Sequence, residues 1–330
     1  MTWLVWRQYR AQGAIAFALL AAFAAVILVG GFQIASHWHS MLAACSGHSA
    51  CLQQQPPLAS PAVVDALLLV GMTVPAVLGM LWGAPLVAHE LESRTSDFAW
   101  AQSVTRTRWL AVKVGWLLLA ATAFGGAIAA LVTWWSGPSN ALAASAFRPG
   151  QFDVQGIVPV GYAVFAMALG IAAGTAARRT LPAIAVALGG FIAVRLVITD
   201  FVRPHYMAAV TTYYNVTSSF TPSGSAWPFS QGAVSKTGQV VPAGWGDLFP
   251  ALPAACQKLL PGSGGPTAKA GSSMSAVFSC MRAHGWRGFA TYQPASRYWP
   301  FQGIETGIYL LLAGALIAVT FVIVRRRDAS

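Results

Sequence analysis

Six long apolar stretches run along the chain, and each is close to the length that a helix needs to cross a bilayer. A hydrocarbon core of about 30 Å takes about 20 residues of α-helix. The stretches cover residues 11–32, 61–82, 110–134, 155–176, 181–199 and 302–324. The pattern therefore predicts an all-α polytopic membrane protein with six transmembrane helices.

Composition supports this interpretation. Hydrophobic residues make up 56% of the chain and charged residues only 9%, whereas a soluble domain carries about a quarter charged residues. A chain so poor in charge has little with which to cover a water-facing surface, and a lipid environment removes that need. The net charge of +11 could also suggest a nucleic-acid partner, but most of the basic residues lie at the ends of the apolar stretches, so we predict none.

The basic residues also predict the orientation of the spans, because Lys and Arg favour the cytosolic flanks. The flanks that we place inside carry Arg7, Arg10, Arg94, Arg106, Arg108, Lys113, Arg178, Arg179, Arg325, Arg326 and Arg327, whereas the loop 34–60 carries no Lys or Arg. Long translocated segments are largely exempt from this rule, so basic residues in 200–301 do not oppose it. We predict a multi-pass protein of the cell membrane with both termini in the cytosol.

The segment between the fifth and sixth stretches is long enough for a small folded domain. Residues 210–220 are dense in β-branched and aromatic residues, which favours a strand, and residues 274–284 have helical apolar spacing. We therefore expect three parts: spans one to five with an N-terminal interfacial helix (1–199), a small extracellular α+β domain (200–301), and span six with a basic cytosolic tail (302–330).

All four cysteines fall in segments that we place outside the cell. Cys45 and Cys51 lie in the first outer loop, and Cys256 and Cys280 in the last. An even number on the oxidising side suggests disulfides, and loop closure favours the two local pairs. The neighbouring histidines His37, His39 and His48 raise a metal site as the alternative, but their spacing matches no standard zinc pattern, so we predict no metal.

The chain contains no convincing catalytic motif. The sequence His89-Glu90 begins like a zinc-protease helix but lacks the second histidine, and residues 262–269 resemble a phosphate-binding loop without its Gly-Lys-Ser/Thr ending. We therefore predict a chain that is not an enzyme. If ATP drives it, a partner chain supplies the nucleotide site.

The inner loop 84–107 is the most informative stretch, because it holds three of the nine acidic residues. It predicts a short helix with exposed carboxylates and aromatic anchors, which suits docking into a groove of a soluble partner. The residues concerned are Glu90, Glu92, Arg94, Asp97, Phe98 and Trp100. The alternative is a loop that packs on its own helix bundle.

The same loop also resembles a family. Its acidic turn, the run QSVTRTRWL at 102–110 and Lys113 resemble the inner loop of ABC-2-type permeases, the membrane subunits of ABC exporters. The opening WRQYR at 6–10, the six-span layout and YQPASRYWPF at 292–301 extend the resemblance.

The resemblance implies a permease dimer, with a second copy or a paralogue, bound to two separate ATPase subunits that hold ATP and Mg. Residues 90–100 would be the coupling helix, and the N-terminal helix with Trp6, Arg7 and Arg10 the connecting helix of that family. The chain departs from the family in one place. Typical members have a compact hairpin between spans five and six, whereas this chain inserts about a hundred residues, as 200–301 shows.

Three charged residues lie within or near the outer ends of the spans: Asp65, Arg195 and Glu305. Charge at membrane depth is costly and marks a pathway or a pair. We consider two interpretations, a paired ring that closes the outer end of a substrate path and a structural salt bridge. The glycine pairs 79/83 and 170/174 have a spacing that lets helices approach closely.

These observations favour the permease subunit of an ATP-driven exporter. The alternative is a membrane sensor or scaffold whose extracellular domain binds a ligand or partner. The sequence does not identify the substrate.

Overall fold

The computed structural model describes residues 2–45, 51, 60–85, 88, 105–143, 146–147, 150–218, 226–242, 252–259 and 274–326. Its chain forms two compact units, which we describe separately. Unit 1 comprises Met1–Tyr206 and Tyr298–Ser330, and unit 2 comprises Met207–Arg297. Unit 2 is therefore an insertion between two stretches of unit 1.

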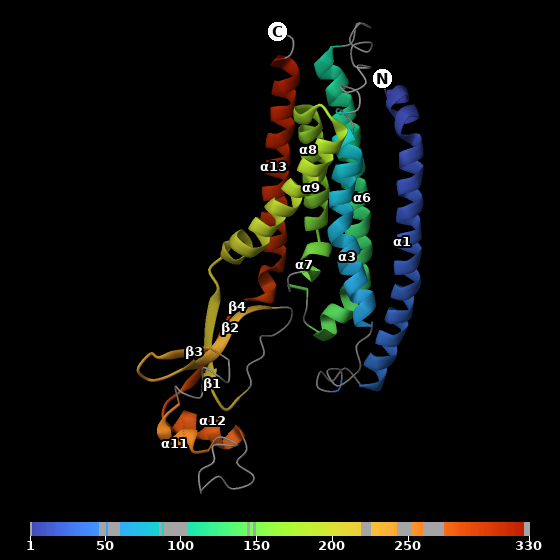
Figure 1. The fold of residues 1–330 in the computed structure, drawn as a ribbon. Helices are drawn as coiled ribbons and strands as arrows, with labels where there is room; N and C mark the ends of the chain where they lie inside the picture. The colour runs from blue at the N-terminus through green and yellow to red at the C-terminus, as the bar shows by residue number, and fades with distance from the viewer. Residues whose placement is uncertain are drawn as a thin grey trace. The chain divides into compact units, whose positions relative to one another are not determined.

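Unit 1 is helical (Figure 1). Its helices are α1 (Thr2–Ala44), α3 (Pro61–Leu78), α6 (Arg106–Ala143), α7 (Gln151–Val154), α8 (Val158–Ala177), α9 (Thr180–Val197) and α13 (Tyr298–Arg326). In the described part of the chain, five segments are long and apolar enough to cross a membrane: Gly13–Ala44, Thr107–Pro138, Val158–Ala177, Thr180–His205 and Ala295–Arg326. A polytopic helical membrane protein is thus confirmed, and the count of six stays a prediction.

The segment predicted as the second span is helical, as α3, which continues into a π-helical turn, η1 (Gly79–Gly83). This segment is not one of those five. Pro75 lies inside α3, where it cannot donate a backbone hydrogen bond. The hydroxyl of Thr73 donates to the carbonyl oxygen of Leu69 at 2.9 Å. An α-helix with a proline and a π turn is locally irregular, and such π turns are frequent at functional sites.

The helix α1 is longer than predicted. We expected an interfacial helix over 1–10 and a span over 11–32, but the backbone is helical without a break from Thr2 to Ala44. No proline interrupts it, and the Ser36 and Ser40 hydroxyls donate to carbonyl oxygens of their own helix, at 2.9 and 2.7 Å. The helix therefore includes His37 and His39, which the sequence had suggested for a loop.

The helix α8 is the centre of unit 1 and packs against α3, α6, α9 and α13. In its most apolar stretch 78% of the residues are buried, against 12% for α1. Pro159 lies in its first turn, and α8 ends where Arg178 adopts a left-handed conformation and its backbone N–H donates to the carbonyl oxygen of Gly174. The start of α8 follows the preference for proline in the first turn, whereas its end places an arginine in a left-handed conformation that glycine usually adopts.

The two predicted glycine pairs meet on opposite sides of one contact. A Cβ atom on Gly170 would overlap the carbonyl oxygen of Gly79, and one on Gly174 would overlap the carbonyl oxygen of Ala84. A Cβ atom on Gly83 would lie 2.7 Å from the carbonyl oxygen of Met167. Glycine therefore allows α8 and the end of α3 to pack backbone against backbone. The spacing serves a contact within the chain.

Unit 2 contains a four-stranded antiparallel sheet in the order β1-β4-β2-β3. The strands are β1 (Val210–Asn215), β2 (Trp227–Val234), β3 (Val240–Pro242) and β4 (Arg287–Gln293). The predicted strand at 210–220 is confirmed as β1. The central strand β4 pairs with the first and second strands, so the sheet closes only when residues far apart in the sequence have come together.

Two short helices of unit 2 join this sheet through a buried cluster. They are α11 (Ala254–Gln257) and α12 (Met274–Ala283), which confirms the helix predicted at 274–284. Val277 and Met281 are almost fully buried against Ala233, Val241 and Trp286. A disulfide between Cys256 and Cys280 links the helices.

The second disulfide joins Cys45, at the end of α1, to Cys51. Both pairs are the local ones that loop closure favours, so the predicted disulfides are confirmed. Cys256, Cys280 and His284 lie close enough to share a metal ion, but both sulfur atoms are committed to the disulfide. His284 Nδ1 lies 3.8 Å from each sulfur.

Candidate functional site

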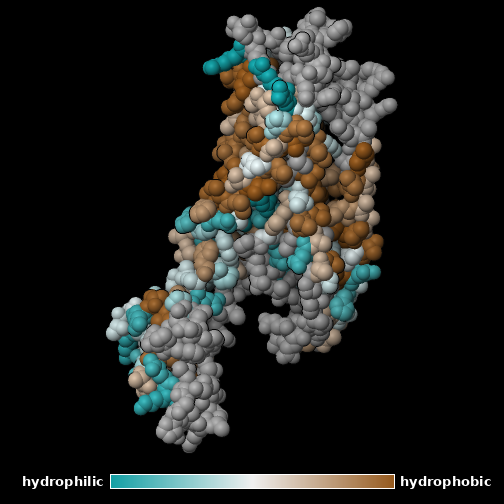
Figure 2. Space-filling view, viewed as in Figure 1, coloured by the Kyte–Doolittle hydropathy of each residue, from teal (hydrophilic) through white to brown (hydrophobic). Residues whose placement is uncertain are grey.

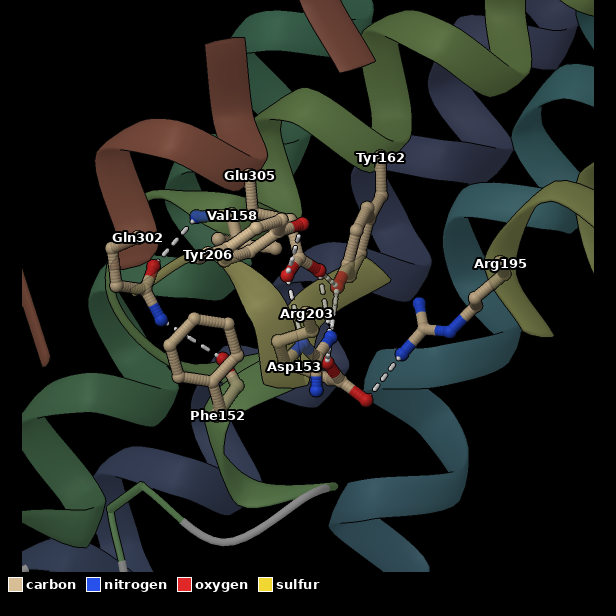
Figure 3. A network of polar contacts seen from close by, with 9 residues as sticks. All are labelled: Phe152, Asp153, Val158, Tyr162, Arg195, Arg203, Tyr206, Gln302 and Glu305. Carbon is tan, nitrogen blue, oxygen red and sulfur yellow. Dashed lines mark hydrogen bonds and ion pairs between the residues drawn. The ribbon is translucent and has the colours of Figure 1, made fainter. Parts of the chain in front are cut away.

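A buried cluster of charged side chains lies at one end of α8 (Figure 3). We call it the charge cluster, and it consists of Asp153, Tyr162, Arg195, Arg203 and Glu305. These residues come from α7, α8, α9, the 3-10 turn η3 (Arg203–His205) and α13. Five segments of unit 1 thus contribute to one polar site.

Arg203 is the hub of the charge cluster and is 1% exposed. Its Nε donates to Glu305 Oε2 at 2.8 Å and its Nη2 to Glu305 Oε1 at 2.6 Å, so the guanidinium binds the carboxylate in a bidentate manner. The same Nη2 lies 2.5 Å from Asp153 Oδ1. A bidentate ion pair is stronger and more directional than an ion pair through one atom.

The Tyr162 hydroxyl lies between the two carboxylates. It is 2.5 Å from Glu305 Oε1 and 3.0 Å from Asp153 Oδ1, and it accepts from Arg203 Nη2 at 3.2 Å. A hydroxyl has one proton to donate, and the shorter distance favours Glu305 as its acceptor. Because Tyr162 is fully buried, water does not compete for these bonds.

Asp153 has a second basic partner, since its Oδ2 lies 2.9 Å from Arg195 Nη2. Burial alone would raise the pKa of Asp153, but the positive charges of Arg195 and Arg203 outweigh burial and lower this pKa below its ordinary value. Asp153 is therefore ionised at neutral pH. With two carboxylates and two guanidiniums, the charge cluster is electrically balanced, which a dry interior requires.

Aromatic rings cover the rest of both guanidinium groups. Arg195 lies 4.3 Å from the centre of the Tyr162 ring and Arg203 lies 4.6 Å from the centre of the Phe152 ring. Within the described residues, Nη1 of each arginine has no hydrogen-bond partner. Cation–π contacts of this kind stabilise the desolvated charge in place of those bonds.

A glutamine fixes the turn between α7 and α8 beside the charge cluster. Gln302 Oε1 accepts from the backbone N–H groups of Ile157 and Val158, both at 2.9 Å, and Gln302 Nε2 donates to the Phe152 carbonyl oxygen at 3.0 Å. The turn contains Gly156 at φ +69°, where a side chain would collide with Gln302. This buried amide satisfies N–H groups at the start of α8 that have no partner within the helix.

The charge cluster also lies at both points where the chain enters and leaves unit 2. Arg203 and Tyr206 immediately precede Met207, and α13 with Glu305 follows Arg297. The Tyr206 hydroxyl donates to Glu305 Oε2 at 3.2 Å. The two covalent connections to the inserted unit are therefore held together by contacts within unit 1.

The sequence anticipated part of this arrangement. Arg195 and Glu305 were expected to be buried charges near one end of the bundle, and both belong to the charge cluster. In the structure the ion pairs are Arg195–Asp153 and Arg203–Glu305. Asp65 is an exposed residue of α3 and contributes no atom to the cluster.

Sequence reasoning missed Asp153, Tyr162 and Arg203. The two charged residues stand just outside the apolar stretches, where a polar residue normally faces water, and their partners are up to 102 positions away, as the pair Arg203–Glu305 shows. One signal in the sequence could have indicated them. Asp153 and Arg203 each lie within a few positions of a predicted span end, and those ends are on the same side of the membrane as Glu305.

The other predicted site residues fall into two groups. Trp6, Arg7 and Arg10 lie within the first three turns of α1. The coupling residues Glu90, Glu92, Arg94, Asp97, Phe98 and Trp100 lie outside the described residues, so their role stays a prediction.

The family model for ABC-2 membrane transporter related proteins matches residues 17–203, which is more than half of the chain. The chain belongs to this ABC-2-related family. No curated protein and no solved structure gave a significant match. The match extends from residue 17, within α1, to Arg203 at the start of η3. It thus includes Asp153, Tyr162, Arg195 and Arg203, whereas Glu305 and unit 2 lie beyond it. The membership supports the expected resemblance and a role in a membrane transport system.

For an ABC-2-related protein, the charge cluster is best interpreted as a structural and mechanical element. Its ionised groups neutralise one another, and Tyr162 and Arg203 are fully buried. The Tyr162 hydroxyl and both carboxylates are engaged in contacts with one another and with Arg203. The cluster can hold α7, α8, α9 and α13 in one arrangement and release them only when several contacts break together.

Proposed function

We propose that the chain is the permease subunit of an ATP-driven exporter, with six spans and both termini in the cytosol. The observation that carries this proposal is the family match over residues 17–203, which covers most of the first segment that we assign to a span and all of the next four. Together with α13, they give the complete bundle of a permease. ATP and Mg would be held by two partner ATPase subunits, because this chain offers no nucleotide motif.

The distribution of basic residues supports the proposed orientation. Figure 1 places the start of α1, the start of α6, the turn between α8 and α9, and the end of α13 at one end of unit 1. We call this the basic end, because the segments carry Arg7, Arg10, Arg106, Arg108, Arg178, Arg179, Arg325 and Arg326. Four separate segments agree, and the basic side of a membrane protein faces the cytosol. Unit 2 and the disulfides then belong to the outer side.

The coupling path in this proposal runs through α3. The helix ends in η1, and residues 90–100 follow within a few positions. Because Gly79 and Gly83 pack directly on α8, a displacement of the inner loop would reach the most buried helix of the bundle without an intervening flexible side chain. The charge cluster at the opposite end of α8 would then act as the outer closure, held by Arg203 and Glu305.

The proposal is tested by an affinity pull-down from detergent-solubilised membranes, with wild-type protein and Glu90→Ala/Glu92→Ala compared. We expect the wild type to recover a soluble ATPase subunit and the variant to lose it, because the two carboxylates would form its docking contact. Arg325→Ala/Arg326→Ala, at the basic end but outside the inner loop, is the control that should keep the ATPase. Recovery of the ATPase subunit with every variant would show that the coupling contact lies elsewhere in the chain. No ATPase with wild type would oppose the permease function and favour a sensor.

A further inference from the structure

An apolar groove of about 550 Å³ opens between α1, α3 and α6. All eleven residues that line it are hydrophobic, among them Leu19 and Phe23 of α1, Val77 of α3, Trp82 of η1 and Phe124 of α6. Figure 2 shows hydrophobic atoms over much of this part of the chain. A site with so little polarity at membrane depth gives a polar ligand no hydrogen-bond partners, but it accepts a hydrocarbon chain.

The length of the groove fits one leaflet. Its wall on α1 runs from Ile15 to Phe23, and its wall on α3 and η1 runs from Val70 to Trp82. At the α-helical rise of 1.5 Å per residue, these walls are about 12 Å and about 18 Å long. Half of a hydrocarbon core of about 30 Å is about 15 Å. The groove therefore matches the depth to which one acyl chain reaches. Its lining residues on α1 lie in the half of that helix nearer its start, and the start of α1 is at the basic end (Figure 1).

The charges beyond the groove favour an anionic headgroup. Arg10 precedes Ile15 by five residues of continuous helix, or about 7.5 Å, and Arg108 at the start of α6 is exposed. Hydrocarbon chains gain little from leaving lipid for an apolar groove, so preference among amphiphiles has to come from the headgroup. Basic residues at a membrane surface attract anionic lipids by about 1 kcal/mol each.

The wall formed by α3 is the part of the groove that the proposed ATP cycle would move. Gly79 and Gly83 face α8, while Leu81 and Trp82 of the same π turn line the groove. Trp82 packs edge-on against Phe124, with ring centres 6.5 Å apart. A push on residues 90–100 would therefore shift an aromatic wall of the groove within a few residues of the push.

We propose that this groove takes one acyl chain of an anionic amphiphile from the leaflet at the basic end, and that this amphiphile is the transported substrate class. The inference rests on the proposed permease function for its transport part. Binding itself requires only the groove, so the two can be tested separately.

The test uses the full chain in nanodiscs of phosphatidylcholine that contain phosphatidylglycerol with a photoreactive acyl chain. After illumination, labelled peptides are mapped by mass spectrometry. We expect label on residues 15–23 and 70–82 in excess of label on α13, whose Leu311 is also exposed to lipid. A photoreactive phosphatidylcholine should label the groove about fivefold less for each basic residue engaged.

The matched variants separate the groove from the general lipid surface. Leu19→Trp/Val77→Trp fills the groove at two exposed positions and should remove most of the label on the groove residues. Leu311→Trp adds the same bulk on α13 and should leave groove labelling unchanged. Label spread in proportion to lipid exposure, or label unaffected by filling, would overturn the site. Equal labelling by both lipids would overturn the anionic class.

The outcome for the permease function is read independently, from recovery of the ATPase subunit. Specific groove labelling without an ATPase partner would keep the binding site and remove its transport role. ATPase recovery without groove labelling would leave the permease intact and refute this inference. Labelling that is absent from a dimer and appears only after the dimer dissociates would show that a second copy covers the groove. That result would likewise refute the inference.

Discussion

The two halves of α8 are held by opposite kinds of interaction. Toward its start, Tyr162 lies in a buried cluster of four charges, and Gln302 satisfies the first backbone N–H groups. Toward its end, Gly170 and Gly174 let the backbone of another helix approach without any side chain between. The first half depends on a few directional contacts between residues distant in sequence, and the second half depends on shape.

This difference decides how each half responds to change. A buried ion pair contributes little net stability over a well-packed apolar substitute, but removal of one partner strands the other charge. A close backbone contact tolerates no added atom, although it involves no charge. We therefore expect losses to depend on charge balance in the first half and on volume in the second.

The largest loss is expected from Arg203→Met. The substitution leaves Glu305 without a basic partner and Asp153 with Arg195 alone, and stranding a buried charge costs about 3–5 kcal/mol. The measurement is the thermal midpoint of the purified protein in detergent, with elution by size-exclusion chromatography as a check on folding. Arg179→Met, at an exposed position of the turn after α8, is the control and should behave like the wild type.

Charge balance is then tested by the double variant Arg203→Met/Glu305→Met. It removes one whole pair and leaves Asp153 with Arg195, so the double variant should recover most of the stability that Arg203→Met loses. If the double variant loses as much stability as the two single variants lose together, the cluster acts through packing. The contrast between the two halves of α8 would then disappear.

The next largest effect is expected from Gly170→Val, which tests the other half. A side chain at this position would overlap backbone atoms of Gly79 and Ala84 that cannot rotate away, so we expect a loss at the upper end of the 1–3 kcal/mol typical of overpacking. Gly189→Ala is the matched control, because a Cβ atom there meets nothing within 4 Å, and alanine favours a helix by about 1 kcal/mol. Equal midpoints for both variants would contradict direct backbone packing.

These two halves also differ in how well the sequence predicts them. The glycine spacing at 79/83 and 170/174 pointed to close helix approach, because small residues at one helical period are sufficient for it. The spans and both disulfides followed from hydropathy and cysteine placement for the same local reason. By contrast, the partners of Arg195 and Glu305 depend on how α7, η3 and α13 meet in space.

Asp153 illustrates why the rest could not be predicted. It lies just before a span, where hydropathy does not distinguish a carboxylate facing water from one facing the bundle. Its burial follows only once Phe152 packs against Phe147 and Tyr298, and the second of these contacts spans 146 positions, as the numbers 152 and 298 show. The continuous helix through Ala44 was missed for a different reason, since polar residues after an apolar stretch were interpreted as a loop although nothing there disfavours helix.

A smaller effect is expected from Gln302→Leu, which removes the polar support of α8 without altering charge. The backbone N–H groups of Ile157 and Val158 would lose their acceptor, and a buried unsatisfied donor costs about 1–3 kcal/mol. Hydrogen exchange at the first turn of α8 should rise more than exchange near Gly170. Gln302→Glu keeps an acceptor but adds a buried charge, so it should not rescue the loss. Uniform exchange along α8 would mean that its two halves unfold as one unit.

The smallest effect concerns pH and separates the contributions of the two arginines to Asp153. Because its pKa lies below the ordinary value, Asp153 contributes stability that is fully present above about pH 4 and is lost as the pH falls through its lowered pKa. Between pH 7 and pH 4.5, the ionisation of Asp153 should therefore not change the stability of the wild type.

In Arg195→Met, burial still raises the pKa of Asp153 while one opposing charge is gone, so the loss of stability begins at a higher pH. The difference between the thermal midpoints at pH 7 and pH 4.5 should therefore be larger in the variant than in the wild type. Parallel midpoints would show that Arg203 alone keeps Asp153 ionised, and that the first half of α8 depends on one arginine.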